Sequence, residues 1–450
     1  MSKIAPPVSA RARTHRAALP VLLCTQLLIA INVAVVNVGL TGIQHDLHYT
    51  PATLSWVVNA YLLAYGGFLI VGGRLGDIIG RRRAMVLGLS VFTVAVVIAA
   101  VVPGLLILAR ALQGLGAALA SPAVLAVITN LYEGRARSRA LGWFSVVTGV
   151  GLSAGMIFGG IIVQWLDWRW IFILNIPVAV VLVVLNRTML PALRPEQRGR
   201  LDLLGAVLAT LAALGLVFGF VELGAHVAID AIWIIAFAVA ALALIGLVAH
   251  LRRATNPLLP VALFMDPARV GAFVANALLG GAVTGVIFFL SEFFGGTLHL
   301  APIAIGAAFL FLTVPQLPTA LTVSRAIHRI GVRAVVWTST SLMLVGILLL
   351  VPLDSYTSLN PVLALAMVLI GLGVGGVFFA INTTVMSTVE PHIAGGASGM
   401  LGTSLQLGGS VGIAILVLAQ GFGGMTAVMS TAAAFVVISM LALSLRRRVG

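Results

Sequence analysis

The stretch that decides the fold reads Gly73-Arg74-Leu75-Gly76-Asp77-Ile78-Ile79-Gly80-Arg81-Arg82-Arg83. It lies between two long apolar segments and holds three glycines, one aspartate and four arginines. Glycine permits tight turns and close backbone approach, and an aspartate in a basic run can pair with an arginine or cap a helix. Two interpretations are open from these residues alone: a basic loop that only orients a membrane protein, or a functional motif.

The composition identifies the class of protein around this stretch. Of the 450 residues, 61% are hydrophobic and 8% are charged, and the mean hydropathy is +1.16. Soluble domains carry about a quarter of charged residues, so an integral membrane protein is predicted. The net charge of +14 comes from basic clusters between apolar runs. That arrangement indicates membrane topology, and no nucleic-acid partner is expected.

Fourteen apolar segments are each long enough to cross a bilayer as a helix. The first follows a basic start that resembles a secretory signal, but it is too long for one, so it is interpreted as an uncleaved span. The predicted spans are 19–41, 52–72, 84–102, 105–130, 140–163, 169–189, 203–223, 229–250, 270–293, 303–323, 334–352, 361–385, 397–419 and 425–445.

The arginines give the orientation of these spans. With the N-terminus inside, the even-numbered loops and the Arg446–Arg448 tail hold the basic residues, as the positive-inside rule requires. Only Arg110, within a span, and Arg169, beside Asp167, depart from this pattern, and the loop around Glu390 lacks arginine. We therefore expect a multi-pass protein of the plasma membrane with both termini in the cytoplasm.

The two halves of the chain repeat each other. The segment Ser324–Arg333 parallels Gly73–Arg82, with His328 in the place of Asp77, and Ala397–Met400 parallels Ala140–Trp143. An all-α membrane fold of two six-helix bundles is predicted, at 19–190 and 269–445, with a linker and two inserted helices at 191–268 and cytoplasmic tails at 1–18 and 446–450. Duplicated halves are typical of transporters, whose substrate cavity lies between them near the bilayer midplane.

Five motifs follow one another along the chain. They are Gly73–Arg83 between spans 2 and 3, Arg110–Gly116 in span 4, Gly149–Gly160 in span 5, Trp168–Pro177 and Asn256–Pro260. Together they resemble the major facilitator superfamily, specifically its fourteen-span drug:proton antiporter branch. Three positions depart from the pattern of that branch. Asn32 stands where the branch has an aspartate, Thr41 where it has the proline that ends the first-span motif, and Met156 where it has the span-5 proline.

The resemblance implies roles for two sets of residues. In the cytoplasmic loop, a gating contact that holds the outward-open state would use Gly73, Arg74, Gly76, Asp77, Gly80, Arg81 and Arg82. In span 5, a small-residue face for close helix packing would use Gly151, Gly155, Gly159 and Gly160, and the family role of that face is to keep the cavity from leaking.

Polar residues inside the spans are the candidates for coupling and binding. A buried guanidinium is costly unless it faces a cavity or polar groups, which favours function for Arg110. The candidates for proton coupling are Arg110, Glu292 and Glu222. Aromatic neighbours of Glu292 favour its protonated form, but the simpler interpretation is a carboxylate at the membrane interface that reaches outer water. The candidates for the substrate cavity are Asn32, Asn37, Tyr61, Gln113, Gln316 and Asn382. The alternative for such polar residues is a hydrogen bond that joins two helices.

No residue set suggests an enzyme, a nucleotide-binding loop, a metal site or any other cofactor. The leading hypothesis is an exporter of hydrophobic or amphipathic small molecules (drugs, antibiotics or toxic metabolites) by alternating access, in exchange for protons, working as a monomer in the lipid bilayer. Because Asn32 replaces the first-span acid, the alternative is a proton-independent facilitator or an exporter of neutral or anionic compounds. A membrane sensor without transport is the third hypothesis.

Overall fold

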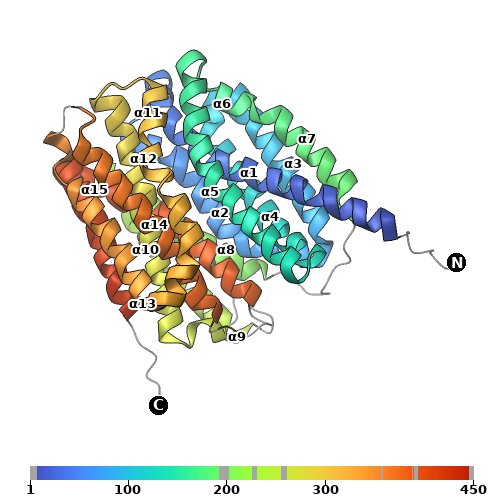
Figure 1. The fold of residues 1–450 in the computed structure, drawn as a ribbon. Helices are drawn as coiled ribbons and strands as arrows, with labels where there is room; N and C mark the ends of the chain where they lie inside the picture. Colours follow the sequence, from blue (N-terminus) through green and yellow to red (C-terminus); the bar gives the residue numbers. More distant parts are fainter. Residues whose placement is uncertain are drawn as a thin grey trace.

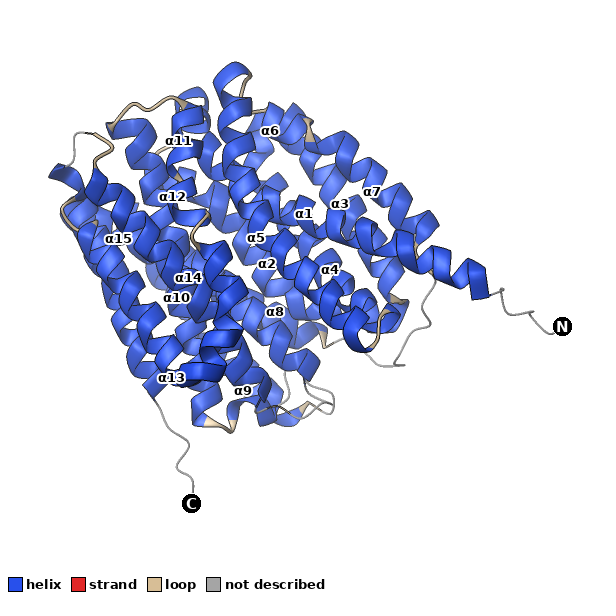
Figure 2. Ribbon diagram, viewed as in Figure 1, coloured by secondary structure: helices blue, strands red, loops and turns tan. Residues whose placement is uncertain are grey.

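The computed structural model describes residues 8–191, 202–225, 231–254, 261–355, 358–387, 389 and 394–444. Within these residues every regular element is helical, as Figure 2 shows. The predicted linker motif Asn256–Pro260, the loop at Glu390 and His392, and the tails 1–7 and 445–450 lie outside the described residues.

The first half of the chain and the inserted pair contain nine helices in the described residues. They are α1 (Val8–Leu47), α2 (Pro51–Ile79), α3 (Arg81–Val101), α4 (Leu106–Leu131), α5 (Gly134–Trp165), α6 (Trp170–Ile173), α7 (Asn175–Met189), α8 (Leu203–Ala225) and α9 (Ala231–Arg253). A 3-10 turn, Pro103–Leu105, leads into α4.

The second half begins after a 3-10 turn at Val261–Phe264. Its helices are α10 (Pro267–Glu292), α11 (Pro302–Ala308), α12 (Leu310–Thr313), α13 (Gln316–Leu349), α14 (Pro361–Ser387) and α15 (Ala394–Ser444). A single π-helical turn, Phe293–Thr297, continues α10, and a 3-10 turn, Leu353–Ser355, precedes α14.

The number of spans agrees with the predicted fourteen. Thirteen helical segments of the described chain are long and apolar enough to cross a membrane, and the last of them, Gly396–Ser444, has 49 residues. A helix of that length extends about 74 Å, more than twice the roughly 30 Å of a hydrocarbon core. Its backbone is non-helical at Gly423 and Gly424, so it folds back as two spans.

The predicted basic loops are shorter than the sequence suggests. Helix α2 continues seven residues past the predicted span end, to Ile79, and α3 starts at Arg81, so Gly80 alone separates them. The prediction ended each span where the apolar run ends, but a helix continues into polar sequence as long as its backbone bonds are made. The predicted loop between spans 10 and 11 is equally short, because Gly331 is the only non-helical residue inside α13.

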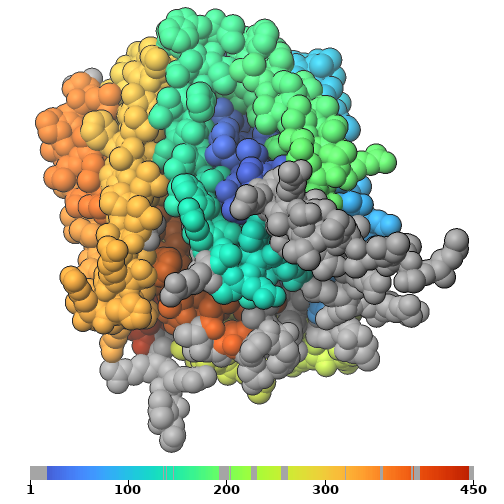
Figure 3. All heavy atoms as spheres, turned by 45° about the vertical axis from the view of Figure 1, so that its right-hand side comes forward, coloured from blue at the N-terminus to red at the C-terminus, as the bar shows by residue number. Residues whose placement is uncertain are grey.

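Figure 1 shows the two halves side by side, with α1–α7 in blue to green and α10–α15 in yellow to red. The inserted helix α8 packs against α9, α2 and α15. Two seams join the halves: α2 lies along α15, and α5 lies beside α11–α13, which Figure 3 shows as teal against gold. Below, the "basic end" is the end of the bundle that carries Arg81–Arg83, and the "opposite end" is the end that carries Thr50.

Small residues allow both seams to close. A Cβ at Gly66 of α2 would lie 2.9 Å from the Gln406 side chain of α15, and one at Gly160 of α5 would lie 2.7 Å from the Pro302 carbonyl oxygen. At the opposite end, Ser291 of α10 donates a hydrogen bond to the carbonyl oxygen of Asn37 in α1. The halves therefore meet through close backbone approach and a small number of polar bonds.

Candidate functional site

The turn between α2 and α3 depends on one glycine. Gly80 ends α2 and precedes α3 with φ 96° and ψ 132°. This positive-φ region is strained for residues with a Cβ, so glycine is the residue that fits it. Because of this turn, α3 begins at Arg81, directly after Gly80. The side chains of Asp77 and Arg81 lie within reach of each other across the turn.

Polar bonds tie this turn to its neighbours. The Arg81 Nη2 atom lies 3.3 Å from Asp77 Oδ1, and Arg81 Nη1 donates to the Ala126 carbonyl oxygen of α4 at 2.9 Å. Arg82 Nη1 donates to the Leu190 carbonyl oxygen just after α7 at 3.0 Å. Two arginines thus connect the ends of four helices, and Asp77 adds a charged contact between α2 and α3.

The close approach that we predicted for the glycines of this stretch occurs one residue earlier. A Cβ at Gly73 or Gly76 would meet nothing nearer than 3.8 or 3.7 Å, which is ordinary contact. A Cβ at Gly72 would lie 2.1 Å from the Ala118 carbonyl oxygen of α4. The helix continues through this segment, and its rotation turns Gly72 rather than Gly73 towards α4.

Arg110 lies in the second turn of α4, 1% exposed, among neutral polar groups. Its Nε donates to the Val57 carbonyl oxygen at 2.9 Å, and its Nη1 donates to Asn32 Oδ1 at 3.0 Å and to Gln113 Oε1 at 2.7 Å. Its Cζ lies 4.4 Å from the centroid of the Tyr61 ring, a cation–π contact. We call Arg110, Asn32, Gln113 and Tyr61 the arginine cluster.

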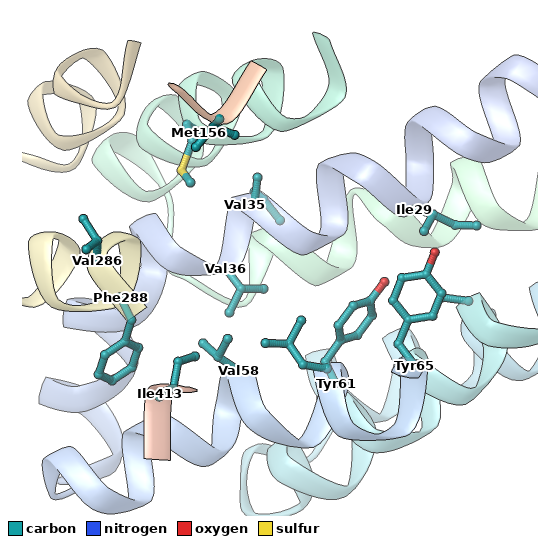
Figure 4. Close-up of a cluster of buried hydrophobic side chains, with 14 of the residues drawn as sticks. Ile29, Val35, Val36, Val58, Tyr61, Tyr65, Met156, Val286, Phe288 and Ile413 are labelled. Carbon is teal, nitrogen blue, oxygen red and sulfur yellow. The ribbon is translucent and has the colours of Figure 1, made fainter. Parts of the chain in front are cut away.

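The arginine cluster carries a positive charge without an acid. Within the described chain no Asp or Glu forms an ion pair with Arg110, because the position opposite it is Asn32. Three buried polar atoms of the cluster have no hydrogen-bond partner: Asn32 Nδ2, Gln113 Nε2 and the Tyr61 hydroxyl. Figure 4 shows Tyr61 beside Tyr65, with both hydroxyl groups directed towards the helix that carries Ile29.

The other residues predicted for the substrate cavity do not join this cluster. The Asn37 side chain donates to the carbonyl oxygen of Val33 in its own helix at 3.2 Å. Gln316 donates to the Leu312 carbonyl oxygen at 3.2 Å, and Asn382 is exposed on α14. The structure brings together Asn32, Tyr61 and Gln113 with Arg110, and it places the other three elsewhere.

Two predicted acids flank a cavity at the opposite end. Glu222 of α8 lines a cavity of about 590 Å³ with Trp56 of α2 and Gln420 of α15. Gln420 is also the polar neighbour of Glu292, whose Oε2 atom is buried without a hydrogen-bond partner. Gln420 lines the same cavity as Glu222 and is the polar neighbour of Glu292, so both acids lie near the place where the first half, the inserted pair and the second half meet.

The glycines of span 5 face two different helices. A Cβ at Gly151 would lie 2.7 Å from the Ala30 side chain, and one at Gly155 would lie 2.8 Å from the Ile31 carbonyl oxygen, both in α1. Gly159 faces the Val35 carbonyl oxygen of α1 at 2.9 Å in the same way. Gly160, one residue on, faces α11 of the other half. The motif therefore lets α5 pack closely on its own bundle and across the seam.

Several contacts between helices were not predicted. Trp56 and Gln420 in the cavity and the bond from Ser291 to Asn37 join helices far apart in sequence, which sequence patterns do not reveal. Arg169 was noted only as an exception to the charge pattern. Arg169 Nη2 donates to Asp46 Oδ2 at 2.8 Å and so links the end of α1 to the α5–α6 turn.

Within the described residues, no group of three or more His, Cys, Asp or Glu side chains is placed to hold a metal ion. The side chains in these sites offer charged groups and hydrogen-bonding groups. The arginine cluster lies on α1, α2 and α4 within the first half, whereas Glu222 and Glu292 lie on α8 and α10.

Comparison with known proteins identifies the family. The model of the major facilitator superfamily matches residues 22–265 and 272–449. A puromycin resistance protein of Streptomyces alboniger is 35% identical over 406 residues, which are 88% of this chain and 80% of that protein. A cephamycin export protein of Amycolatopsis lactamdurans is 36% identical over 414 residues, 90% of this chain and 85% of that protein.

The fold comparison agrees with the sequence comparison. The solved structure of the human organic anion transporter MFSD10 matches with a TM-score of 0.66 and 18% identity, covering 98% of this chain and 100% of that chain. At this identity the match concerns the fold alone. The family model and the two antibiotic relatives show that the chain belongs to the major facilitator superfamily, among its antibiotic- and drug-export members.

Proposed function

We propose that this protein exports hydrophobic or amphipathic small molecules by alternating access between its two halves. The observation that carries the proposal is the construction of the two seams, where Gly66 meets α15 and Gly160 meets α11 through backbone-close contacts. Such contacts separate and re-form without breaking a large polar network, which suits a rocking movement of two bundles. The antibiotic relatives make puromycin and cephamycin the first compounds to test.

We propose proton exchange as the energy source, with Glu292 as the proton carrier. Glu292 is the last residue of α10, and its sequence neighbours Phe289 and Phe293 are buried. An unpartnered buried carboxylate oxygen is unfavourable when charged, and a proton relieves that cost. Glu222 would take up the proton from the cavity that it lines with Gln420, the polar neighbour of Glu292.

We propose that the protein lies in the plasma membrane with the basic end on the cytoplasmic side, because the positive-inside rule places Arg81–Arg83 there. In this orientation the contact between Asp77 and Arg81 would act as the gating contact on the cytoplasmic side. The cavity beside Glu222 would then open towards the outside, where a proton-driven exporter takes up its protons. One polypeptide holds both halves and both seams, so we propose that the monomer is the transporting unit.

The test uses everted membrane vesicles from an export-deficient bacterial host that expresses the full chain. An imposed pH gradient is expected to drive accumulation of labelled puromycin, and a protonophore is expected to abolish it. Glu292→Gln is expected to abolish the gradient dependence. Asp354→Asn, which removes an exposed acid at the same end of the molecule, is the matched control and is expected to keep it. No accumulation of any tested compound, with protein present in the membrane, would contradict the proposed export.

A specific observation favours a second candidate, a proton-independent transporter. Arg110 bonds to Asn32 where the antiporter branch has an acid, so the arginine cluster holds no carboxylate to protonate. Under this alternative, transport follows the substrate gradient alone, and Glu292→Gln leaves it intact. Asn32→Asp restores the acid: if it creates a pH-gradient dependence that the unmodified protein lacks, the proton-independent candidate is correct.

A further inference from the structure

We propose that the arginine cluster is a subsite that binds a carboxylate group of the transported molecule. The inference rests on the proposed export function and adds the chemical class of the substrate. It assigns Arg110 to ligand recognition, with Asn32, Gln113 and Tyr61 as the neighbouring hydrogen-bonding groups. The ligand class is an amphipathic molecule with one carboxylate, whose apolar part fits the surrounding apolar helices.

The charge of Arg110 is not balanced within the arginine cluster. The Arg110 guanidinium is 1% exposed, and only neutral oxygen atoms of Val57, Asn32 and Gln113 accept its bonds. A buried charge is unfavourable unless it is paired, and neutral oxygen atoms leave the net charge in place. A guanidinium matches a carboxylate in charge and in its fork geometry, so a carboxylate is the group that completes this site.

The amide groups of Asn32 and Gln113 have a fixed direction in the arginine cluster. Arg110 Nη1 can only donate, so the oxygen atoms of Asn32 and Gln113 must face it. Their NH2 groups therefore point away from the guanidinium, and both nitrogen atoms are buried without an acceptor. The Tyr61 hydroxyl is buried and unpartnered as well. Three groups able to donate thus surround one cation, and the missing component is an acceptor that carries negative charge.

The cluster also lies close to the seam between the halves. Asn32 is one helical turn before Val36, on the same face of α1. Figure 4 shows Val36 and Val58 of the first half beside Ile413 of α15. When α15 moves away from the first half, this side of the cluster is uncovered. The unpartnered donors of the closed arrangement are then available to a ligand that enters between the halves.

A single substitution can place a competing carboxylate in the arginine cluster. Asn32 Oδ1 lies 3.0 Å from Arg110 Nη1, so Asn32→Asp places a carboxylate of the protein itself at the guanidinium with almost no change in shape. The internal acid would occupy the site that we assign to the substrate. If Arg110 has only a structural role, Asn32→Asp adds an ion pair but leaves the preference for a carboxylate ligand unchanged.

The experiment measures binding to purified full-length protein in lipid nanodiscs at pH 7.4. The probes are dansyl-phenylalanine and its methyl ester, which differ by the single negative charge, and dansyl fluorescence reports binding. The unmodified protein is expected to bind the acid about tenfold more tightly than the ester, a factor that corresponds to about 1.4 kcal/mol. Asn32→Asp and Arg110→Gln are expected to reduce this ratio to about one, since the charge attraction is then absent.

Two controls keep the outcome interpretable. Asn360→Asp makes the same chemical change at the N-terminus of α14, where the Asn360 side chain accepts a bond from the Leu363 backbone and Asp caps equally well. It is expected to keep the tenfold ratio. Arg110→Gln is assayed only as a monodisperse sample with a cooperative melting transition, and Asn32→Asp decides the question if Arg110→Gln does not fold.

Two outcomes would overturn the inference. One is equal binding of acid and ester by the unmodified protein, and the other is an unchanged ratio in Asn32→Asp. Export of cephamycin, an antibiotic that carries a carboxylate, separates the two proposals in vesicles. If export is present while acid and ester bind equally, the carboxylate subsite is wrong and the export function stands. If export is absent while the acid is preferred, the binding site stands and the export function is wrong.

Discussion

Gly80 and Gly331 occupy equivalent turns of the two halves and share one unusual backbone conformation. Gly80 has φ 96° and ψ 132°, and Gly331 has φ 83° and ψ 154°. Each is the single non-helical residue between two spans at the basic end. The chain thus repeats a glycine turn although the residues around it differ, with Asp77 in one copy and His328 in the other.

Gly331→Ala is expected to destabilise the protein through the backbone alone. A Cβ at Gly331 would meet nothing within 4 Å, so contact strain is absent, and the positive φ costs about 1–3 kcal/mol for a residue with a side chain. Thermal unfolding in detergent measures the change. Gly104→Ala is the control, because a Cβ there also meets nothing and its φ is ordinary. Equal melting temperatures for the two variants would show that the turn does not need glycine.

The sequence predicted this architecture because spans, repeat and turn glycines are local signals. Helix starts at Pro51, Pro302 and Pro361 agree with the predicted boundaries, since proline fits the first turn of a helix. The paired turns at Gly80 and Gly331 were visible as a repeated motif. The division of the chain at 19–190, 191–268 and 269–445 stays a prediction.

The candidate site could be predicted only in part. Arg110 and Gln113 share a face of one helix, so their association follows from spacing. Their contacts to Asn32 and Tyr61 depend on how three helices pack, which spacing does not contain. The position of α8 was equally hidden, because a helix that is apolar on all sides gives no signal of which face docks. The cavity at Glu222 exists only through that docking.

Asp77→Asn is expected to reduce export while leaving stability and membrane insertion nearly unchanged. The ion pair with Arg81 is partly exposed, and such pairs contribute about 0–1 kcal/mol to stability. A contact made in only one conformation shifts the balance between conformations, and about 1.4 kcal/mol corresponds to a tenfold change. Vesicle transport per unit of inserted protein is the measurement, with Glu133→Gln, an acid without a capping bond at the same end, as control. Full transport activity of Asp77→Asn would remove this contact from the gating proposal.

Gly155→Ala is expected to separate α5 from α1. A Cβ at this position would lie 2.8 Å from the Ile31 carbonyl oxygen, a backbone atom that cannot rotate away. Overpacking of this kind costs about 1–3 kcal/mol, which lowers the melting temperature. Gly142→Ala in the same helix meets nothing within 4 Å and is expected to be neutral or slightly stabilising, because alanine favours helix. The two substitutions are chemically identical, so similar melting temperatures would refute the close α1–α5 contact.

Gly295→Ala is expected to oppose closure of the opposite end. A Cβ on Gly295, in the π-helical turn after α10, would lie 2.0 Å from Thr41 Oγ1 of α1. Both residues border the contact in which Ser291 donates to the Asn37 carbonyl oxygen, so the added methyl group keeps α1 and α10 apart. Export is expected to fall by about tenfold, since closing this end then costs roughly 1.4 kcal/mol more.

Thr41→Gly removes the opposing side chain, and combined with Gly295→Ala it is expected to restore most of the export. Residues in contact give such non-additive effects, whereas independent sites add. Additive losses in the double variant, measured by vesicle transport, would show that Gly295 and Thr41 do not meet during the transport cycle.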